Sequence, residues 1–344
     1  MPYPIEVHHR IRKDEQADHV RIASALGRCV GVVSIQHEYG IWGGEDGGHV
    51  IDFVRSLDVP SVVTLHTVLQ QPTPGQRAVL SDLVALTDAT VVMSRSAADL
   101  LTTAYGVDRG RVHVIPHGVP DLPLVDAESV KPDLGVAGRQ VILSFGLLGP
   151  GKGYELAIAA LPDVVAAHPT VLYLVLGATH PDLIRTQGED YRKSLMDTVA
   201  KLGLGDHVRF VDRFVGRVEL TQWLEAADVF VTPYPNLDQI VSGTMSYAMG
   251  AGRAIVSTPY AYARELLAEG RGILVPPASS AALATALNEV LGDSDLRAAI
   301  GRQAYEYSRG MVWSAVGAKY GDLFAQVATP VQSTARPSLL AAGV

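Results

Sequence analysis

The sequence of 344 residues is poor in cysteine and aromatic residues and has no long apolar run. Its single cysteine, Cys29, excludes a disulfide framework and any zinc site built from several cysteines. No apolar stretch approaches the roughly 20 residues that a membrane-spanning helix requires. The first 20 residues carry charges but no apolar core, so they lack the pattern of a secretory signal. We therefore expect a cytoplasmic protein without a transmembrane segment.

Positive charge is also scarce, because 28 lysines and arginines face 36 aspartates and glutamates, for a net charge of −8. A general nucleic-acid-binding protein carries a basic face, so we expect no nucleic-acid partner. Hydrophobic residues make up 48% of the chain and charged residues 19%, which is a globular composition and excludes a disordered chain. The length suggests two domains, at roughly 150 residues per domain.

Short β-branched apolar runs alternate with longer amphipathic segments along most of the chain. One such segment, 154–168, has apolar side chains at helical spacing. Continuous apolar strands that alternate with helices predict an α/β protein, in which helices cover both faces of parallel sheets. The predicted strands are 31–37, 61–67, 89–94, 112–117, 141–146, 172–177, 208–214, 229–234, 254–258 and 272–276.

The clearest domain boundary is the stretch 116–134, which holds four of the chain's 20 prolines. Because proline interrupts regular structure, we divide the chain near residue 122, into a first domain of residues 1–121 and a second of residues 122–310. The last residues, 327–344, show no periodicity and are expected to form a flexible tail.

A glycine-rich loop follows the predicted strand that ends at Gly146, and it contains Gly149, Gly151, Lys152 and Gly153. Glycines let backbone amides approach a ligand, the following helix N-terminus favours an anion, and lysine adds a point charge for phosphate. The loop matches neither the P-loop pattern nor G-x-G-x-x-G. A phosphate-binding loop and an ordinary strand-to-helix turn with a solvated lysine both remain open.

A second loop follows the predicted strand that ends at Tyr234, and Ser242-Gly243-Thr244 then opens a short helix. These residue types suit a helix start with free amides, so the alternatives are an anion site and a plain N-cap. Two such loops at the carboxyl ends of strands in one domain favour a ligand site, because α/β sheets bind ligands at that edge.

Residues 120–326 resemble the nucleotide-sugar half of a retaining GT-B glycosyltransferase of the GT4 type, the glycosyl transferases group 1. The family pattern G-R-x-x-x-x-K-G is similar to 146–153, with Leu147 in place of the arginine. The resemblance implies a GT-B fold, two Rossmann-like domains facing a cleft, the N-terminal one truncated. It assigns the donor diphosphate to Gly146, Gly151, Lys152, Ser242, Gly243 and Thr244.

Two glutamates of the family, separated by seven residues and followed by A-M-x-x-G, resemble Gln239 and Tyr247, neither of which is a carboxylate. The resemblance implies that Gln239 lies near the donor sugar, with a catalytic role, and that Tyr247 lies near the ribose. Glu265 is similar to the glutamate of a later G-G-x-x-E stretch. We place the donor nucleotide and ribose at Arg213, Phe214, Tyr247 and Glu265.

The N-terminal half resembles the family in its later part. The segment 64–67 is similar to a strand end whose histidine reaches the transferred sugar, which gives His66 a catalytic role, although a lone histidine is more often a surface or core residue. Residues 36–44 resemble a subgroup pattern, Q-H-E-[YF]-G-I-[FW]-G-G. This stretch is either an acceptor-binding loop or a solvated turn, and the acceptor candidates are His37, Glu38 and Trp42.

The first 30 residues lack the strand and glycine-rich turn with which a complete acceptor domain of this family begins. At ~30 residues per strand-helix-strand unit, about two units are missing. Residues 1–121 are therefore expected to form a shortened Rossmann-like domain, which a C-terminal helix, 311–326, completes.

The resemblance implies a retaining hexosyltransferase that moves a sugar from a nucleotide-diphosphate donor, of the GDP-mannose or UDP-glucose type, to an unknown hydroxyl acceptor. The nucleotide sugar is a substrate, and neither a cofactor nor a metal is expected, because the histidines form no H-E-x-x-H pattern. The alternative is a catalytically reduced subunit that binds a nucleotide or sugar phosphate, or an interaction subunit that lacks part of the acceptor domain.

The shortened domain predicts a homodimer, because missing units expose apolar strand and helix surface that symmetric association covers. The segment 3–10 is the proposed contributor to that contact. Light scattering at micromolar concentration should give about twice the chain mass of 36.6 kDa, and deleting residues 1–10 should dissociate the dimer. A mass near one chain would contradict this prediction.

Overall fold

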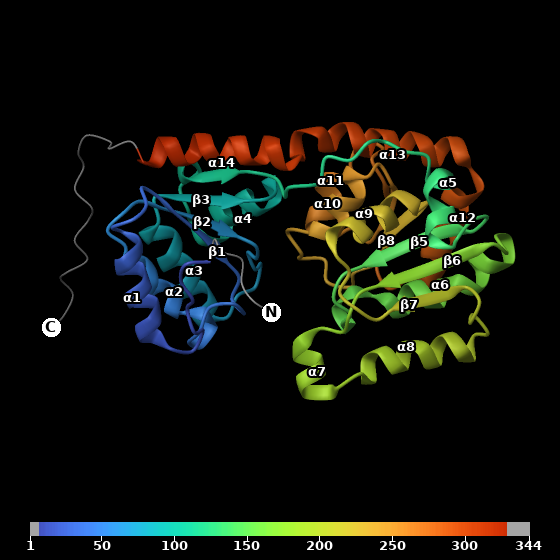
Figure 1. Cartoon of the computed structure of the whole chain (residues 1–344), viewed down its shortest axis with the longest axis horizontal. Helices are drawn as coiled ribbons and strands as arrows, with labels where there is room; N and C mark the ends of the chain where they lie inside the picture. The colour runs from blue at the N-terminus through green and yellow to red at the C-terminus, as the bar shows by residue number, and fades with distance from the viewer. Residues whose placement is uncertain (1–6, 329–344) are drawn as a thin grey trace.

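The computed structural model describes residues 7–328, and these residues form two separate parallel sheets (Figure 1). The strands of these sheets lie within or overlap the predicted strands, and the predicted α/β class is confirmed. In spatial order the first sheet holds β1 (Val33–His37), β2 (Ser61–Leu65), β3 (Ala89–Val92) and β4 (Val112–Val114). The second holds β10 (Ile273–Leu274), β9 (Ala254–Ser257), β8 (Val229–Thr232), β5 (Gln140–Phe145), β6 (Val171–Leu176) and β7 (Val208–Val211).

The strands form where continuous apolar runs can be covered on both faces. Every residue of β6 is buried, as is every residue of β2. Strand β1 differs, because its burial alternates and Ser34 and Gln36 are exposed. It is an edge strand of the first sheet, and part of one of its faces stays open.

Helices connect the strands and cover the sheets, and several begin at a side-chain cap. Thr73 and Gln76 form a capping box at the start of α3, and Ser94 caps α4. The first domain contains α1 (Gln16–Leu26), α2 (His49–Arg55), α3 (Pro74–Leu86) and α4 (Arg95–Tyr105). The second contains α5 (Ala127–Val130), α6 (Tyr154–Ala167), α7 (Pro181–Gln187), α8 (Asp190–Lys201), α9 (Arg217–Ala226), α10 (Gly243–Gly250), α11 (Ala261–Leu266), α12 (Ser280–Gly292) and α13 (Ser294–Ser308). Within residues 7–328, no helix combines the length and apolar composition needed to cross a bilayer.

The last helix, α14 (Trp313–Ala328), returns to the first domain and lies along it (Figure 1). Its Tyr320 hydroxyl is 2.9 Å from the hydroxyl of Thr64 on β2, and its Val316 is buried in a cluster with residues of β2 and β3. This helix occupies the place given to the predicted helix 311–326. Of the predicted tail, 327 and 328 belong to α14, and 329–344 lie outside the described residues, as do residues 3–6 of the proposed dimer segment.

The linker between the domains pairs with the segment that precedes α14. The Val119 amide donates to the carbonyl of Met311 at 2.9 Å, and the Trp313 amide donates to the carbonyl of Val119 at 3.0 Å. Gly118 lies against the Trp313 ring, and a Cβ there would be 2.2 Å from a ring carbon. The two segments of the chain that connect the domains, the linker and the segment before α14, therefore run side by side.

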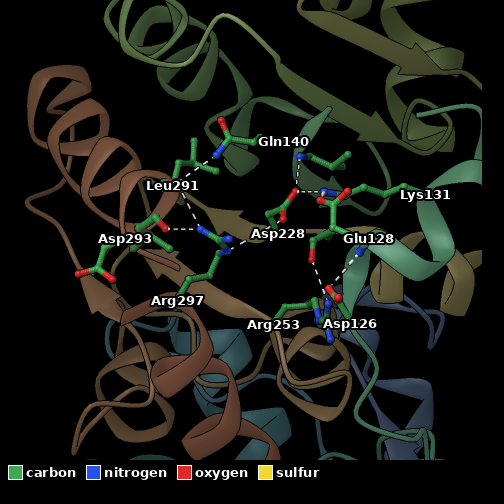
Figure 2. Close-up of polar contacts among 12 residues, drawn as sticks. Asp126, Glu128, Lys131, Gln140, Asp228, Arg253, Leu291, Asp293 and Arg297 are labelled. Atoms are coloured by element: carbon green, nitrogen blue, oxygen red, sulfur yellow. Dashed lines mark hydrogen bonds and ion pairs between the residues drawn. The ribbon is translucent and has the colours of Figure 1, made fainter. Parts of the chain in front are cut away.

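A buried ion cluster lies at the amino ends of the strands in the second domain (Figure 2). Asp228, which directly precedes β8, accepts hydrogen bonds from Lys131 Nζ at 2.7 Å and from the Val141 amide at 2.6 Å. The Lys131 side chain is fully buried and also pairs with Glu128, and Arg297 lies 4.0 Å from the same aspartate. This cluster ties the segment before β5 to β8 at the edge away from the strands' carboxyl ends.

We predict that Asp228→Asn lowers the free energy of unfolding by about 3 kcal/mol, because it leaves a buried lysine without its buried partner. Asp82→Asn is the matched control, since Asp82 pairs with Arg55 at 3.8 Å and both side chains are 57% exposed. The control should lose less than about 1 kcal/mol. Urea unfolding of the three proteins measures both effects, and equal losses would show that the cluster contributes no more than a surface pair.

Candidate functional site

A cavity of about 410 Å³ lies between the two domains, and both domains contribute to its walls. Its residues follow β1 and β2 in the first domain, and β5 and β8 in the second. Figure 1 shows β5 and β6 pointing toward the first domain, so the cavity lies at the edge where parallel sheets bind ligands. The residues that line it are Glu38, His66, Thr67, Val68, Leu69, Lys152, Asn236, Asp238, Gln239, Ile240 and Val241.

Tyr234 joins the two predicted phosphate loops. Lys152 Nζ lies 4.5 Å from the centre of the Tyr234 ring, a cation–π contact, and the Tyr234 hydroxyl is 3.1 Å from the hydroxyl of Thr244. Gly146 is also close, because a Cβ there would be 3.5 Å from the Thr244 methyl group. The structure thus brings together Gly146, Lys152 and Thr244, which lie far apart in the sequence, while Gly151 is in the loop beside Lys152.

At the N-terminus of α10, near this lysine, the amides of Gly243 and Thr244 have no hydrogen-bond partner among residues 7–328. Ser242 is almost fully buried, and its hydroxyl accepts the Met245 amide at 3.3 Å, so this side chain acts as the N-cap. The amides of Gly243 and Thr244 are in the first turn, where a helix offers no internal acceptor. An N-terminus with free amides and a nearby lysine favours an anion such as phosphate.

His117, in the linker, lies against the same helix start. A Cβ on Gly243 would be 2.8 Å from His117 Nε2, and Tyr247 meets the His117 ring edge-on at 6.1 Å. Burial lowers the pKa of His117, which keeps the imidazole neutral near pH 7. The sequence places His117 only within the proline-rich boundary 116–134, and nothing in the pattern indicates that this histidine lies beside the helix amides.

His66 and Glu38 form the wall that faces Lys152. His66 Nε2 is 2.8 Å from Gln36 Oε1, and burial lowers the pKa of His66, so it is neutral near pH 7. Glu38 accepts a hydrogen bond from the Thr67 hydroxyl at 2.6 Å, and burial raises the pKa of the Glu38 carboxyl. Both were predicted as site residues, and both line the cavity.

The loop after β8 carries Gln239 and reaches into the first domain. Gln239 lines the cavity and donates its side-chain amide to the Val241 carbonyl at 2.8 Å. Ile240 is only 4% exposed and belongs to the hydrophobic core of the first domain, while its carbonyl accepts the Ser94 hydroxyl at 3.0 Å. An apolar residue in a loop that is otherwise largely polar is the sequence signal for this contact.

Two acceptor candidates pack inside the first domain and do not line the cavity. His37 is fully buried, and neither of its ring nitrogens has a hydrogen-bond partner among residues 7–328. Trp42 donates its indole N–H to the Gln36 carbonyl at 3.1 Å, and its ring lies 5.4 Å from that of Phe53. Both positions are those of packing residues.

The residues assigned to the donor nucleotide are dispersed. Glu265 bridges the domains, because its carboxylate accepts the amides of Arg95 at 2.9 Å and Ser96 at 3.1 Å at the start of α4. Arg213 donates a hydrogen bond to Glu219 at 2.7 Å, and the Phe214 side chain is 83% exposed. Tyr247 is half-buried and its ring packs against that of Phe145. None of the four assigned residues, Arg213, Phe214, Tyr247 and Glu265, lines the cavity between the domains.

Comparison with known families decides what kind of protein this is. Residues 126–307, more than half of the chain, match the family described as Glycosyl transferases group 1, and residues 46–121 match Glycosyltransferase Family 4. The chain belongs to the group 1 glycosyltransferases. The family indicated by the two loops is therefore confirmed, and the match covers every predicted diphosphate residue.

Similar group 1 glycosyltransferases are bacterial. The chain is 31% identical over 211 residues to a phosphatidyl-myo-inositol mannosyltransferase of Mycolicibacterium smegmatis, a match that covers 60% of this chain and 49% of that protein. It is 28% identical over 292 residues to a D-inositol 3-phosphate glycosyltransferase of Xylanimonas cellulosilytica, covering 78% of this chain and 67% of that one. The chain thus spans between half and two thirds of the length of these relatives.

Solved structures of group 1-like folds agree with the architecture. Anabaena HepE in complex with UDP has a TM-score of 0.73 and 20% identity, covering 90% of this chain and 82% of that chain. Sucrose-phosphate synthase of Thermosynechococcus elongatus has a TM-score of 0.75 and 20% identity, covering 90% and 77%. The predicted GT-B fold is confirmed.

We predict that His37 makes this glycosyltransferase acid-sensitive. Burial lowers the pKa of His37 from 6.5 to about 4, so the unfolded chain takes up a proton between these values and the folded chain does not. Stability is therefore lost as the pH falls through this window. Between pH 7 and pH 5, urea unfolding should show that wild type loses about 2 kcal/mol more than His37→Leu. Equal losses in the two proteins would contradict this assignment.

Proposed function

We propose that the protein is a retaining hexosyltransferase that uses a nucleotide-diphosphate sugar, with the cavity between the domains as its active site. One observation carries the proposal. The second domain contributes Lys152 to the cavity, and Tyr234 links this lysine to the start of α10, whereas the first domain contributes His66 and Glu38. A group that binds a diphosphate thus faces a polar wall suited to a hydroxyl acceptor.

The chemistry requires stabilisation of the leaving diphosphate. As the bond from the anomeric carbon to the phosphate oxygen breaks, Lys152 and the amides of Gly243 and Thr244 lie where negative charge develops. The acceptor oxygen bonds to the anomeric carbon on the same face, and its proton passes to the departing phosphate oxygen. This route uses no protein base, so Gln239 and Tyr247 can replace the family glutamates without removing a proton acceptor.

His66 has the properties of a sugar-binding residue in this scheme. Its imidazole is neutral near pH 7 because burial lowers its pKa, and Gln36 holds one ring nitrogen. A neutral imidazole donates or accepts a hydrogen bond without adding charge to the cavity. Domain closure around the cavity would exclude water and favour transfer over hydrolysis.

Donor and acceptor classes follow from the relatives. HepE was solved in complex with UDP, and two relatives are a phosphatidyl-myo-inositol mannosyltransferase and a D-inositol 3-phosphate glycosyltransferase. UDP-glucose and GDP-mannose are therefore the donors to test first, and inositol compounds are the acceptors to test first. We propose that the reaction uses neither a metal nor a cofactor, since the nucleotide sugar is a substrate. We also propose that the protein is cytoplasmic.

The alternative proposal is a subunit that binds a nucleotide sugar without transferring it. The replacement of both family glutamates by Gln239 and Tyr247, and the partly open edge strand β1, favour it. Turnover of either donor, measured as release of nucleoside diphosphate, decides between the two. Tight nucleotide binding without release would support the alternative, and the absence of both would contradict the two proposals together.

We predict that Lys152→Ala weakens nucleoside diphosphate binding at least tenfold, about 1.4 kcal/mol. The effect is large because Leu147 takes the place of the second cation that the family pattern provides. Lys201→Ala, at the exposed end of α8, is the matched loss of a lysine and should not change the affinity. Calorimetry with UDP and GDP measures the affinities, and an unchanged value for Lys152→Ala in a folded protein would refute the phosphate assignment.

A further inference from the structure

The positive and the negative side chains that line the cavity lie in different parts of it. Lys152 contributes the one lysine or arginine among the described residues that line it, and it stands beside the N-terminus of α10. Two carboxylates, Glu38 and Asp238, line the remainder. If the donor diphosphate occupies Lys152, the space left for a second substrate is bordered by negative and neutral groups alone.

The Glu38 carboxylate has few hydrogen-bond donors for a half-buried charged group. It is half-buried, and the Thr67 hydroxyl is its one hydrogen-bond donor among residues 7–328, with no cation in an ion pair. An ionised carboxylate accepts about four hydrogen bonds, so most of its acceptor capacity is unused. Withdrawing a carboxylate from water without donors costs free energy, which a ligand hydroxyl at this position would offset.

Asp238 is held at the cavity by its backbone. Its amide donates to Asn236 Oδ1 at 3.0 Å, and the carbonyls on either side of it, those of Leu237 and Gln239, accept amides of the α11 segment at 2.9 and 3.1 Å. No described residue donates to its side-chain carboxylate or pairs with it. The loop therefore presents a second negative charge from a fixed position.

The histidine in the cavity does not offset these charges. Burial lowers the pKa of His66, so its imidazole is neutral near pH 7. Its Nε2 is already engaged by Gln36 at 2.8 Å. A phosphate on the second substrate would consequently meet like charge and find no free cation in the lining.

We infer that the acceptor is an uncharged polyol, such as a cyclitol or a sugar, and that Glu38 accepts a hydrogen bond from one of its hydroxyls. This inference rests on the proposed function, whose active site it divides into a donor half and an acceptor half. Glu38 is thus a specificity-determining residue, because its charge selects hydroxyl donors and rejects anions.

The test is a ligand-observed NMR titration of the full chain saturated with UDP, and in parallel with GDP. Two matched pairs serve as probes, myo-inositol with D-inositol 3-phosphate, and glucose with glucose 6-phosphate. The uncharged member of at least one pair should bind at least tenfold more tightly than its phosphorylated partner. Glu38→Gln should reduce this ratio of affinities about tenfold, because it weakens binding of the polyol and permits binding of the phosphorylated probe. Asp238→Asn should also reduce the ratio.

Glu306→Gln, an exposed glutamate on α13, is the matched control and should leave the ratio unchanged. The inference would be overturned if the phosphorylated members bind equally well or more tightly, or if neither member of the pairs binds. It would also be overturned if neither Glu38→Gln nor Asp238→Asn changes the ratio of affinities. Donor turnover is measured separately. Polyol selectivity without turnover would support a polyol site beside Glu38 but contradict the proposed transfer, and with it the assignment of that polyol as an acceptor. Turnover with a phosphorylated acceptor preferred would support the transfer and overturn the inference.

Discussion

The site depends on the burial of one side chain of the second domain, Ile240, in the hydrophobic core of the first. Removing an isoleucine side chain from water contributes about 2 kcal/mol, and the Ser94 hydroxyl adds a hydrogen bond to the carbonyl of the same residue. Because Ile240 lies between Gln239 and Val241, its insertion holds the cavity-lining loop against the first domain. This contact therefore ties one wall of the cavity directly to the other domain.

Other contacts between the domains support the same arrangement. Glu265 accepts two amides at the start of α4, where a carboxylate also interacts favourably with the helix dipole. Helix α14 and the linker cross side by side, and Tyr320 bonds to Thr64 on β2. The two domains are thus joined at several points besides Ile240.

Stability and function occupy opposite edges of the second sheet. The Asp228 cluster binds the amino ends of β5 and β8 (Figure 2), while Lys152 and the start of α10 lie at the carboxyl ends. The first domain has four strands among the described residues, yet β1 and β2 are the strands that deliver Glu38 and His66. A short first sheet therefore still contributes to the cavity, since this contribution needs only the ends of those two strands.

The sequence by itself determined the strands, the α/β class and the family, and it marked two candidate phosphate loops, because each depends on local pattern. Apolar runs, glycine positions and Ser242–Thr244 are readable without knowing what packs against them. Tertiary structure decided which predicted residues share the cavity: Lys152, His66, Glu38 and Gln239 do, whereas His37 and Trp42 pack and Glu265 bridges the domains. His117 and Ile240 acquire their places only through packing. The physical reason is that a polar side chain at a strand end has the same local signature whether it meets a ligand, a core or another domain, and only the folded arrangement distinguishes these.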